Sequence, residues 1–263
     1  AIKHRRLITR KDMNVRTVQI WFLCGARLFC QSNRLVLSTL LPLIAPDLGL
    51  DTVQKGKLLS GFPLGYLCTQ VVGGVFSDHF GGKPVMAVAL FSVGFGVLAF
   101  SYVHVFDHLW WVSFCMGFLE GPSFPTNRVL LSQWVPPAEK AYATAVTDIG
   151  GPLGALIAAF CAPLLADQFG WRFTLMVCGV VTIFFAVAWT WFGANNPKSC
   201  KYIGEQEAIY LEATISSVAS GKMDDKRKTG FPISMLMMPA AWSVILAHSA
   251  FNYNRYLLYS WTM

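Results

Sequence analysis

The sequence predicts an all-α membrane protein, on two observations. Only 13% of the 263 residues are charged and 54% are hydrophobic, whereas a soluble domain carries about a quarter charged residues. The apolar residues also gather in seven windows of roughly 20 residues or more, the length that a helix needs to cross a bilayer. These windows are too long for barrel strands and lack their two-residue alternation. We therefore expect the lipid bilayer to surround most of the chain.

The windows follow one another with short connections, except at one long polar segment. We expect a basic N-terminal segment at 1–19, a domain of six membrane helices at 20–193, and an interdomain linker with an amphipathic helix at 194–232. A seventh helix then begins a second domain at 233–263. The predicted helices are Ile20–Ala45, Leu58–Ser77, Pro84–Tyr102, Leu109–Gln133, Ala143–Ala166, Phe173–Phe192 and Pro239–Met263.

The basic residues predict the orientation. If the N-terminus is cytosolic, the segments 1–19, 78–84, 134–142 and 194–232 lie inside and hold 14 Lys and Arg residues, whereas the outside loops hold three. Cytosolic loops show this imbalance. We expect the N-terminus on the cytosolic side, or on the stromal or matrix side of an organelle. The net charge of +7 then belongs to helix flanks, and no nucleic-acid partner is expected. The remaining four basic residues fall within the predicted helices: Arg27, Arg34, Arg128 and Arg255.

Cysteine usage and the remaining patterns predict neither a cofactor nor an enzyme. The seven cysteines are odd in number and show no C-x-x-C spacing, which supports neither a disulfide framework nor a zinc site. The sequence shows no nucleotide-binding loop, metal cluster or nucleophile–base pattern. We expect no cofactor, no metal and no catalytic residue.

The connection between the second and third predicted helices carries the clearest motif. It reads Gly74-Val-Phe-Ser-Asp78-His-Phe-Gly81-Gly82-Lys83 and resembles the loop signature of the major facilitator superfamily, G-x-x-x-D-[RK]-x-G-[RK]-[RK]. We expect Gly74 to allow close approach of a neighbouring helix, and Asp78 to accept hydrogen bonds at the cytosolic helix end. Gly81 should permit a tight turn that Lys83 caps, and His79 replaces the usual basic residue.

Two further stretches resemble one family within that superfamily, the anion:cation symporters. Residues 65–74 read G-Y-L-C-T-Q-V-V-G-G, and Gly117-Phe-Leu-Glu120-Gly121 is followed by L-S-Q-W-V-P at 131–136. Plastid members typically show G-Y-x-x-T-Q-x-x-G-G, G-x-x-E-G and L-S-K-W-V-P; vesicular glutamate carriers, sialin-like carriers and sodium–phosphate carriers are related. The resemblance implies two six-helix halves with the substrate between them, of which this chain carries the N-terminal half and one helix more. It also suggests a chloroplast or other organelle membrane.

Charges within the membrane mark the candidate site, because a charge in hydrocarbon costs several kcal/mol. Arg34 lies halfway along the first predicted helix, and its planar fork matches a carboxylate or phosphate. We expect it to bind the substrate anion together with Asn33, Tyr66 and Gln70. Glu120 lies midway along the fourth helix, where a carboxyl can take up and release a proton, and the resemblance implies proton coupling there. The alternative is a fixed structural pair of Arg34 with Glu120.

Three further charges lie within predicted helices. Asp148 precedes a glycine–proline stretch at 150–154, whose small residues favour close packing and a bend. Arg128 is expected at a similar depth, so the two can pair. Arg255 lies in the seventh helix, one turn after Phe251.

These features predict a secondary active transporter of a small anion, phosphate or organic, coupled to H⁺ or Na⁺ by alternating access. Its partners would be the bilayer, the anion, the coupling ion and the missing C-terminal half. The alternative is a truncated, transporter-like structural subunit bound to other membrane subunits, without transport activity. It is motivated by the end of the chain at Met263, and by Asn33 and Ser113, where many relatives carry charged residues.

Overall fold

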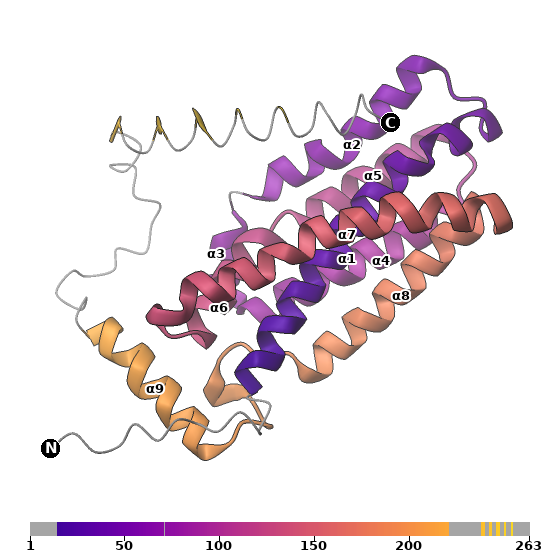
Figure 1. The fold of residues 1–263 in the computed structure, drawn as a ribbon. Helices are drawn as coiled ribbons and strands as arrows, with labels where there is room; N and C mark the ends of the chain where they lie inside the picture. Colours follow the sequence, from indigo (N-terminus) through magenta and orange to yellow (C-terminus); the bar gives the residue numbers. More distant parts are fainter. Residues whose placement is uncertain are drawn as a thin grey trace, which may run out of the picture. The chain divides into compact units, whose positions relative to one another are not determined.

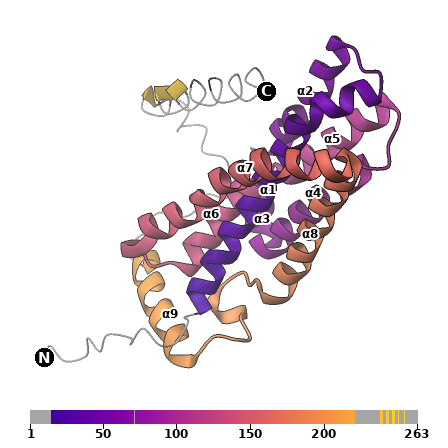
Figure 2. The ribbon, with the colours of Figure 1, turned by 45° about the vertical axis from the view of Figure 1, so that its right-hand side comes forward.

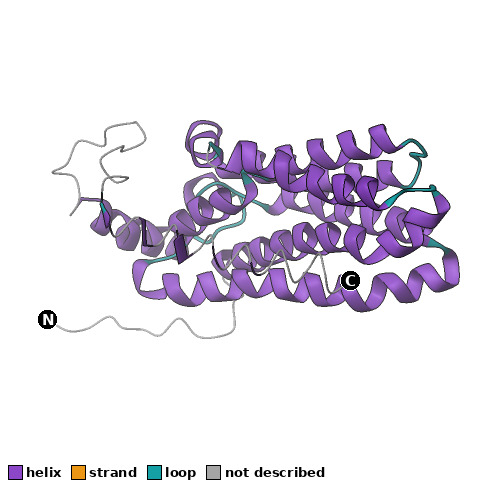
Figure 3. Ribbon diagram, turned by 90° about the horizontal axis from the view of Figure 1, so that it is seen from above, coloured by secondary structure: helices purple, strands orange, loops and turns teal. Residues whose placement is uncertain are grey.

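The computed structural model describes residues 15–70 and 72–220, together with 238, 239, 242, 243, 246, 247, 250 and 254. Within these residues the chain is helical and has no strands (Figures 1 and 3). It divides into two compact units, Ala1–Ile215 and Ser216–Met263, and only the first is described in detail below. Residues 1–14 of the predicted basic segment, most of the seventh helix and Arg255 lie outside the described residues, whereas residues 15–19 of that segment already form the start of α1.

Nine α-helices lie within residues 15–220, and four of them could each cross a membrane by their length and apolarity. The predicted first, third, fifth and sixth windows form α1, α4, α7 and α8, each long and apolar enough to cross a membrane. The second window forms α2 and α3, which would be a fifth span bent by 55°, and the fourth forms α5 and α6. The bounds are α1 Val15–Asp47, α2 Thr52–Gln70, α3 Gly73–Phe80, α4 Gly82–Phe100, α5 Phe106–Glu120, α6 Ser123–Trp134, α7 Lys140–Phe169, α8 Trp171–Phe192 and α9 Glu205–Ser220.

The prediction of one unbroken helix over Leu109–Gln133 is wrong at a proline. Pro122 has no N–H, so it cannot donate to the carbonyl of Phe118 four residues earlier. The Thr69 hydroxyl of α2 donates to this carbonyl instead, at 2.6 Å. The break between α5 and α6 is therefore stabilised by a neighbouring helix, which re-satisfies the freed backbone group.

The helices pack most extensively in three pairs, α1 with α7, α2 with α5, and α4 with α8. Glycines let the backbones touch: a methyl group added at Gly65 or Gly117 would collide with the facing backbone of the α2–α5 pair. Gly150 and Gly154 likewise lie against the backbone of α1, which confirms the predicted close packing of this stretch. Small residues serve this purpose in membranes because lipid is as apolar as the side chains, so that close contact drives association.

The start of α1, the α6–α7 connection and the segment after α8 meet at one end of the bundle. Glu207 of α9 accepts hydrogen bonds from the backbone N–H groups of Val15 and Arg16, each at 3.1 Å, and Figure 2 shows α9 beside the start of α1. Arg16 also pairs with Glu139 at 3.0 Å. The described parts of the two segments predicted to share one side of the membrane therefore share one end; which side this is stays a prediction.

The turn between α3 and α4 lies at the same end and has the geometry that the motif predicts. Gly81 has φ +85°, a left-handed conformation that favours glycine. The backbone N–H of Lys83 donates to Asn195 Oδ1 at 2.6 Å, and its carbonyl accepts from the Trp189 indole at 3.0 Å. The tight turn is confirmed, and the backbone of Lys83 ties it to α8 and the segment that follows.

Candidate functional site

A buried ion pair joins α1 to the end of α5. Arg34 Nη2 lies 2.7 Å from Glu120 Oε1, and the side chains are only 17% and 2% exposed. The guanidinium also lies over two rings of α2, 4.6 Å from the centre of Phe62 and 4.8 Å from that of Tyr66. These rings stack on each other. The cation is therefore held by one carboxylate and by an aromatic wall.

The residues around Glu120 explain its burial. Glu120 is the last residue of α5, directly before the break, and Gly117 and Gly121 flank it where α2 comes closest. Side chains at these two positions would push α2 away, so the G-x-x-E-G stretch encloses the carboxylate. Its Oε2 has no hydrogen-bond partner among the described residues. One oxygen is thus engaged by Arg34, and the other is open to a proton or a cation.

Tyr66 contacts the Arg34–Glu120 pair, but Asn33 and Gln70 do not lie against it. Asn33 is buried against α8, where its Nδ2 donates to Thr182 Oγ1 at 2.7 Å and to the Phe29 carbonyl at 2.9 Å. Gln70 is half-buried at the end of α2, one turn beyond Tyr66. Their predicted role in substrate binding stays a prediction.

A second charged pair lies beside the break, as predicted from its depth. Arg128 Nη2 contacts both carboxylate oxygens of Asp148, at 2.7 and 3.0 Å. Its guanidinium lies 5.0 Å from the centre of the Phe124 ring, and that of Arg27 lies 4.8 Å from the same ring. The sequence interpretation gave Arg27 no role, although its seven-residue spacing from Arg34 was a signal that both lie on one face of α1.

The loop motif is only partly explained. A methyl group added at Gly74 meets nothing within 4 Å, whereas one at Gly73 would lie 2.5 Å from Pro122 Cα. Gly74 was expected to make a close helix–helix contact, but it makes none with the described residues. Gly73 makes the contact instead, because it faces Pro122 at the α5–α6 break. Asp78 is exposed on α3, and no described residue donates a hydrogen bond to it, so its predicted partner is not found there.

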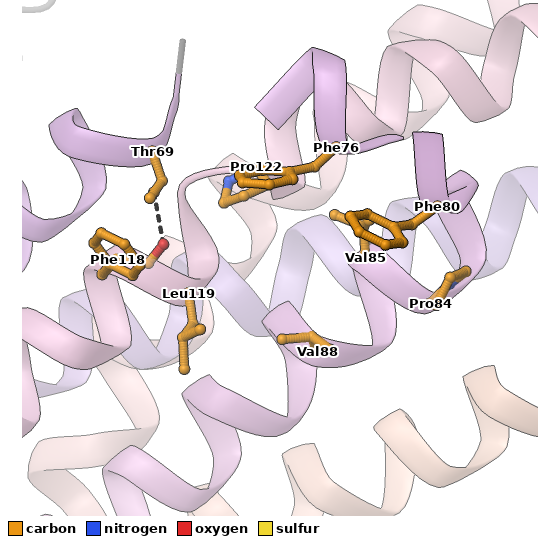
Figure 4. Close-up of a pocket in the computed structure, with 9 residues that line it drawn as sticks. All are labelled: Thr69, Phe76, Phe80, Pro84, Val85, Val88, Phe118, Leu119 and Pro122. Atoms are coloured by element: carbon orange, nitrogen blue, oxygen red, sulfur yellow. Dashed lines mark hydrogen bonds between the residues drawn. The ribbon is translucent and has the colours of Figure 1, made fainter. Parts of the chain in front are cut away.

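An apolar pocket of about 430 Å³ lies beside both breaks (Figure 4). Its wall consists of Thr69 and eight apolar residues, among them Phe76, Phe118 and Pro122. The Thr69 hydroxyl is turned to the Phe118 carbonyl in this view. Because no charged group lines this pocket, the intramembrane charges on α1, α5, α6 and α7 remain the better candidate for an anion site.

Paired apolar helices around buried charges are typical of membrane transport proteins. The family model described as Major Facilitator Superfamily matches residues 23–263. The chain therefore belongs to the Major Facilitator Superfamily. This confirms the predicted fold, an all-α membrane bundle of the major facilitator type.

Relatives confirm the resemblance to anion transporters. The chain is 26% identical over 244 residues to the chloroplastic ascorbate transporter of Arabidopsis thaliana, covering 89% of this chain and 42% of that protein. It is 32% identical over 197 residues to the hexuronate transporter of Bacillus subtilis (strain 168), covering 74% and 46%. Human sialin is 26% identical over 217 residues, with 79% and 41% covered. The chain spans about half the length of the curated relatives that it matches.

The fold is also similar to a solved transporter structure. A bacterial homologue of the human lysosomal transporter Spinster, inward-facing and unoccupied, matches with a TM-score of 0.67 at 18% identity. The match covers 95% of this chain and 55% of that chain. At this identity the likeness concerns the fold alone, and it agrees with a chain that spans one half of a major facilitator and a little more.

Proposed function

We propose that this chain forms part of a secondary active transporter of a small anion, phosphate or organic, coupled to H⁺ or Na⁺ by alternating access. The observation that carries the proposal is the buried pair of Arg34 and Glu120, at 2.7 Å. Two of the relatives named above are transporters of organic anions, ascorbate and hexuronate. A further relative, 27% identical over 252 residues, is the chloroplastic sodium-dependent phosphate transport protein 1 of Arabidopsis thaliana. A transport function is therefore favoured over an enzyme and over the alternative of a purely structural subunit.

Competition for one guanidinium supplies the mechanism. When Glu120 is protonated, or its free oxygen holds Na⁺, Arg34 is released to bind the substrate anion through its planar fork. When the proton or cation leaves, the carboxylate takes Arg34 back and ejects the anion. Arg34 thus has an anionic partner in both states, which avoids the cost of an isolated charge in the membrane.

The wider organisation belongs to the same proposal. Residues 20–193 would be the N-terminal half, 194–232 the interdomain linker, and 233–263 the start of a second half. The N-terminus would face the cytosol or, since the plant relatives are chloroplastic, the stroma of a plastid. Tyr66 and Phe62 would hold the Arg34 guanidinium while its anion changes.

Transport assays on the full-length protein in liposomes test the proposal, with labelled phosphate, ascorbate and glucuronate as probes. Glu120→Gln should keep anion counterflow but lose accumulation driven by a pH or Na⁺ gradient, because the site can no longer switch. Arg34→Ala should lose both activities. The gradient that drives wild-type accumulation identifies the coupling ion.

Arg172→Gln is the control, because Arg172 pairs with Asp47 at the other end of α1. Normal accumulation by Glu120→Gln would rule out its coupling role. Unchanged counterflow by Arg34→Ala would rule out Arg34 as the anion-binding residue.

A further inference from the structure

The intramembrane charges of the described chain do not balance. Glu120 and Asp148 are each paired with their own arginine, Arg34 and Arg128. Arg27 is half-buried on α1, and its Nε is buried without a hydrogen-bond partner among the described residues. No carboxylate of the described part of the chain forms an ion pair with it. Because a charge at this depth is costly without a partner, a counter-ion from outside the described chain would stabilise Arg27.

The surroundings of Arg27 leave its donors available. Its guanidinium carbon lies 4.8 Å from the centre of the Phe124 ring, a cation–π contact that supplies no oxygen or nitrogen acceptor to any of its five N–H donors. On the α7 side stands Gly151, where an added methyl group would lie 3.9 Å from Arg27 Nη2. Neither neighbour offers a side-chain acceptor. Among the described residues, these neighbours hold the guanidinium in place without satisfying its hydrogen bonds.

The position of Arg27 relates it to the anion site. It precedes Arg34 by seven residues, which is two turns of α1, or about 10 Å along the same face. Long, flexible side chains can close much of this gap. A molecule with two acidic groups a few bonds apart can therefore meet both guanidinium groups at once.

We propose that Arg27 is a second anion-binding residue and that the transported substrate is a dianion, with one acidic group on Arg34 and the other on Arg27. The proposal rests on the transport function proposed above. Charge supports it: with Glu120 protonated, the three arginines and Asp148 carry a net charge of two, which a dianion neutralises and a monoanion does not. Arg27 then selects for substrates with two acidic groups, while Arg34 binds one acidic group of either a monoanion or a dianion.

Ligand-dependent thermal stabilisation of the purified full-length protein tests this without requiring transport. Succinate and glutarate are the two-headed probes, and butyrate and valerate are one-headed controls of equal chain length. Wild-type protein should bind the dicarboxylates more tightly. Arg27→Gln should weaken dicarboxylate binding at least tenfold and leave monocarboxylate binding unchanged, which also shows that the variant folds. Arg27→Lys should recover part of the loss, and Arg172→Gln should behave as wild type.

Each other outcome overturns the inference in a distinguishable way. Equal loss for one-headed and two-headed probes in Arg27→Gln would make Arg27 a structural residue. Equal affinity of wild-type protein for succinate and butyrate would refute the dianion while leaving the proposed function intact. If none of the four probes stabilises the wild-type protein, and phosphate, ascorbate and glucuronate do not stabilise it either, the proposed function fails and this inference fails with it.

Discussion

The hydrogen bond from Thr69 to the Phe118 carbonyl gives the sharpest test of how the break between α5 and α6 is stabilised. Thr69→Val keeps the shape of the side chain but removes the only donor to this carbonyl among the described residues, since Pro122 has no N–H. An orphaned carbonyl in apolar surroundings costs about 1–3 kcal/mol, and interhelical hydrogen bonds in membranes contribute about 0.6–1.7 kcal/mol. We expect a loss of about 1–2 kcal/mol in the free energy of unfolding.

Thr174→Val is the matched control. Thr174 is fully buried, and its hydroxyl also donates to a backbone carbonyl, that of Gly170 at 3.1 Å. That carbonyl keeps the Thr174 N–H as a donor at 3.2 Å, so removal of the hydroxyl leaves no orphan. This variant should lose less than about half as much, because only the modest net value of one hydrogen bond disappears.

The assay is reversible unfolding in mixed detergent micelles, extended to a double-mutant cycle. Pro122→Ala restores an N–H that can reach the Phe118 carbonyl, so Thr69→Val should cost little in that background. A coupling energy near zero would refute the reasoning, as would equal losses for Thr69→Val and Thr174→Val. The cycle isolates the pair because both changes act on the same carbonyl.

Three further predictions use the same unfolding assay. Gly73→Ala should lower the free energy of unfolding by about 1–3 kcal/mol, because the added methyl group overpacks against the break. Gly74→Ala should leave it unchanged or raise it by up to about 1 kcal/mol. Equal effects would contradict the assignment of the close contact to Gly73. Asp148→Asn should cost under about 1 kcal/mol, because its pair with Arg128 is more than one-third exposed; a larger loss would mean a buried role. Glu207→Gln should lower the free energy of unfolding by about 0.5–1 kcal/mol, because it weakens the cap on α1. This loss should be smaller in high salt. A loss that does not depend on salt would contradict an electrostatic cap.

Hydrophobic windows and helix depth account for what the sequence could predict. Windows of about 20 apolar residues locate α1, α4, α7 and α8, because length and apolarity are the physical requirements for crossing lipid. Counting along helices at about 1.5 Å per residue was enough to pair Arg128 with Asp148. The pair of Arg34 and Glu120 was anticipated in the same way, as one of two alternatives.

What escaped prediction depends on direction around a helix and on neighbours. Asn33 and Arg34 are adjacent in the sequence, but consecutive helical residues point about 100° apart, so Asn33 contacts Thr182 of α8 whereas Arg34 contacts Glu120. Arg27 lies two turns from Arg34 on the same face of α1, and the sequence analysis assigns it no role. The role of Gly73 could not be read from the motif, because it is set by Pro122 on another helix.

The pairing order of the helices has a consequence for biosynthesis. The most extensive contacts join α1 to α7, α2 to α5 and α4 to α8, so none of these three pairs consists of helices that follow one another along the chain. Arg34 and its carboxylate partner are separated by 86 residues. At translation rates of about 5–20 residues per second, roughly 4–17 s pass between the synthesis of Arg34 and that of Glu120. During that interval the translocon, water or the lipid headgroups must shelter the charge, and slower translation of this stretch would prolong the exposure.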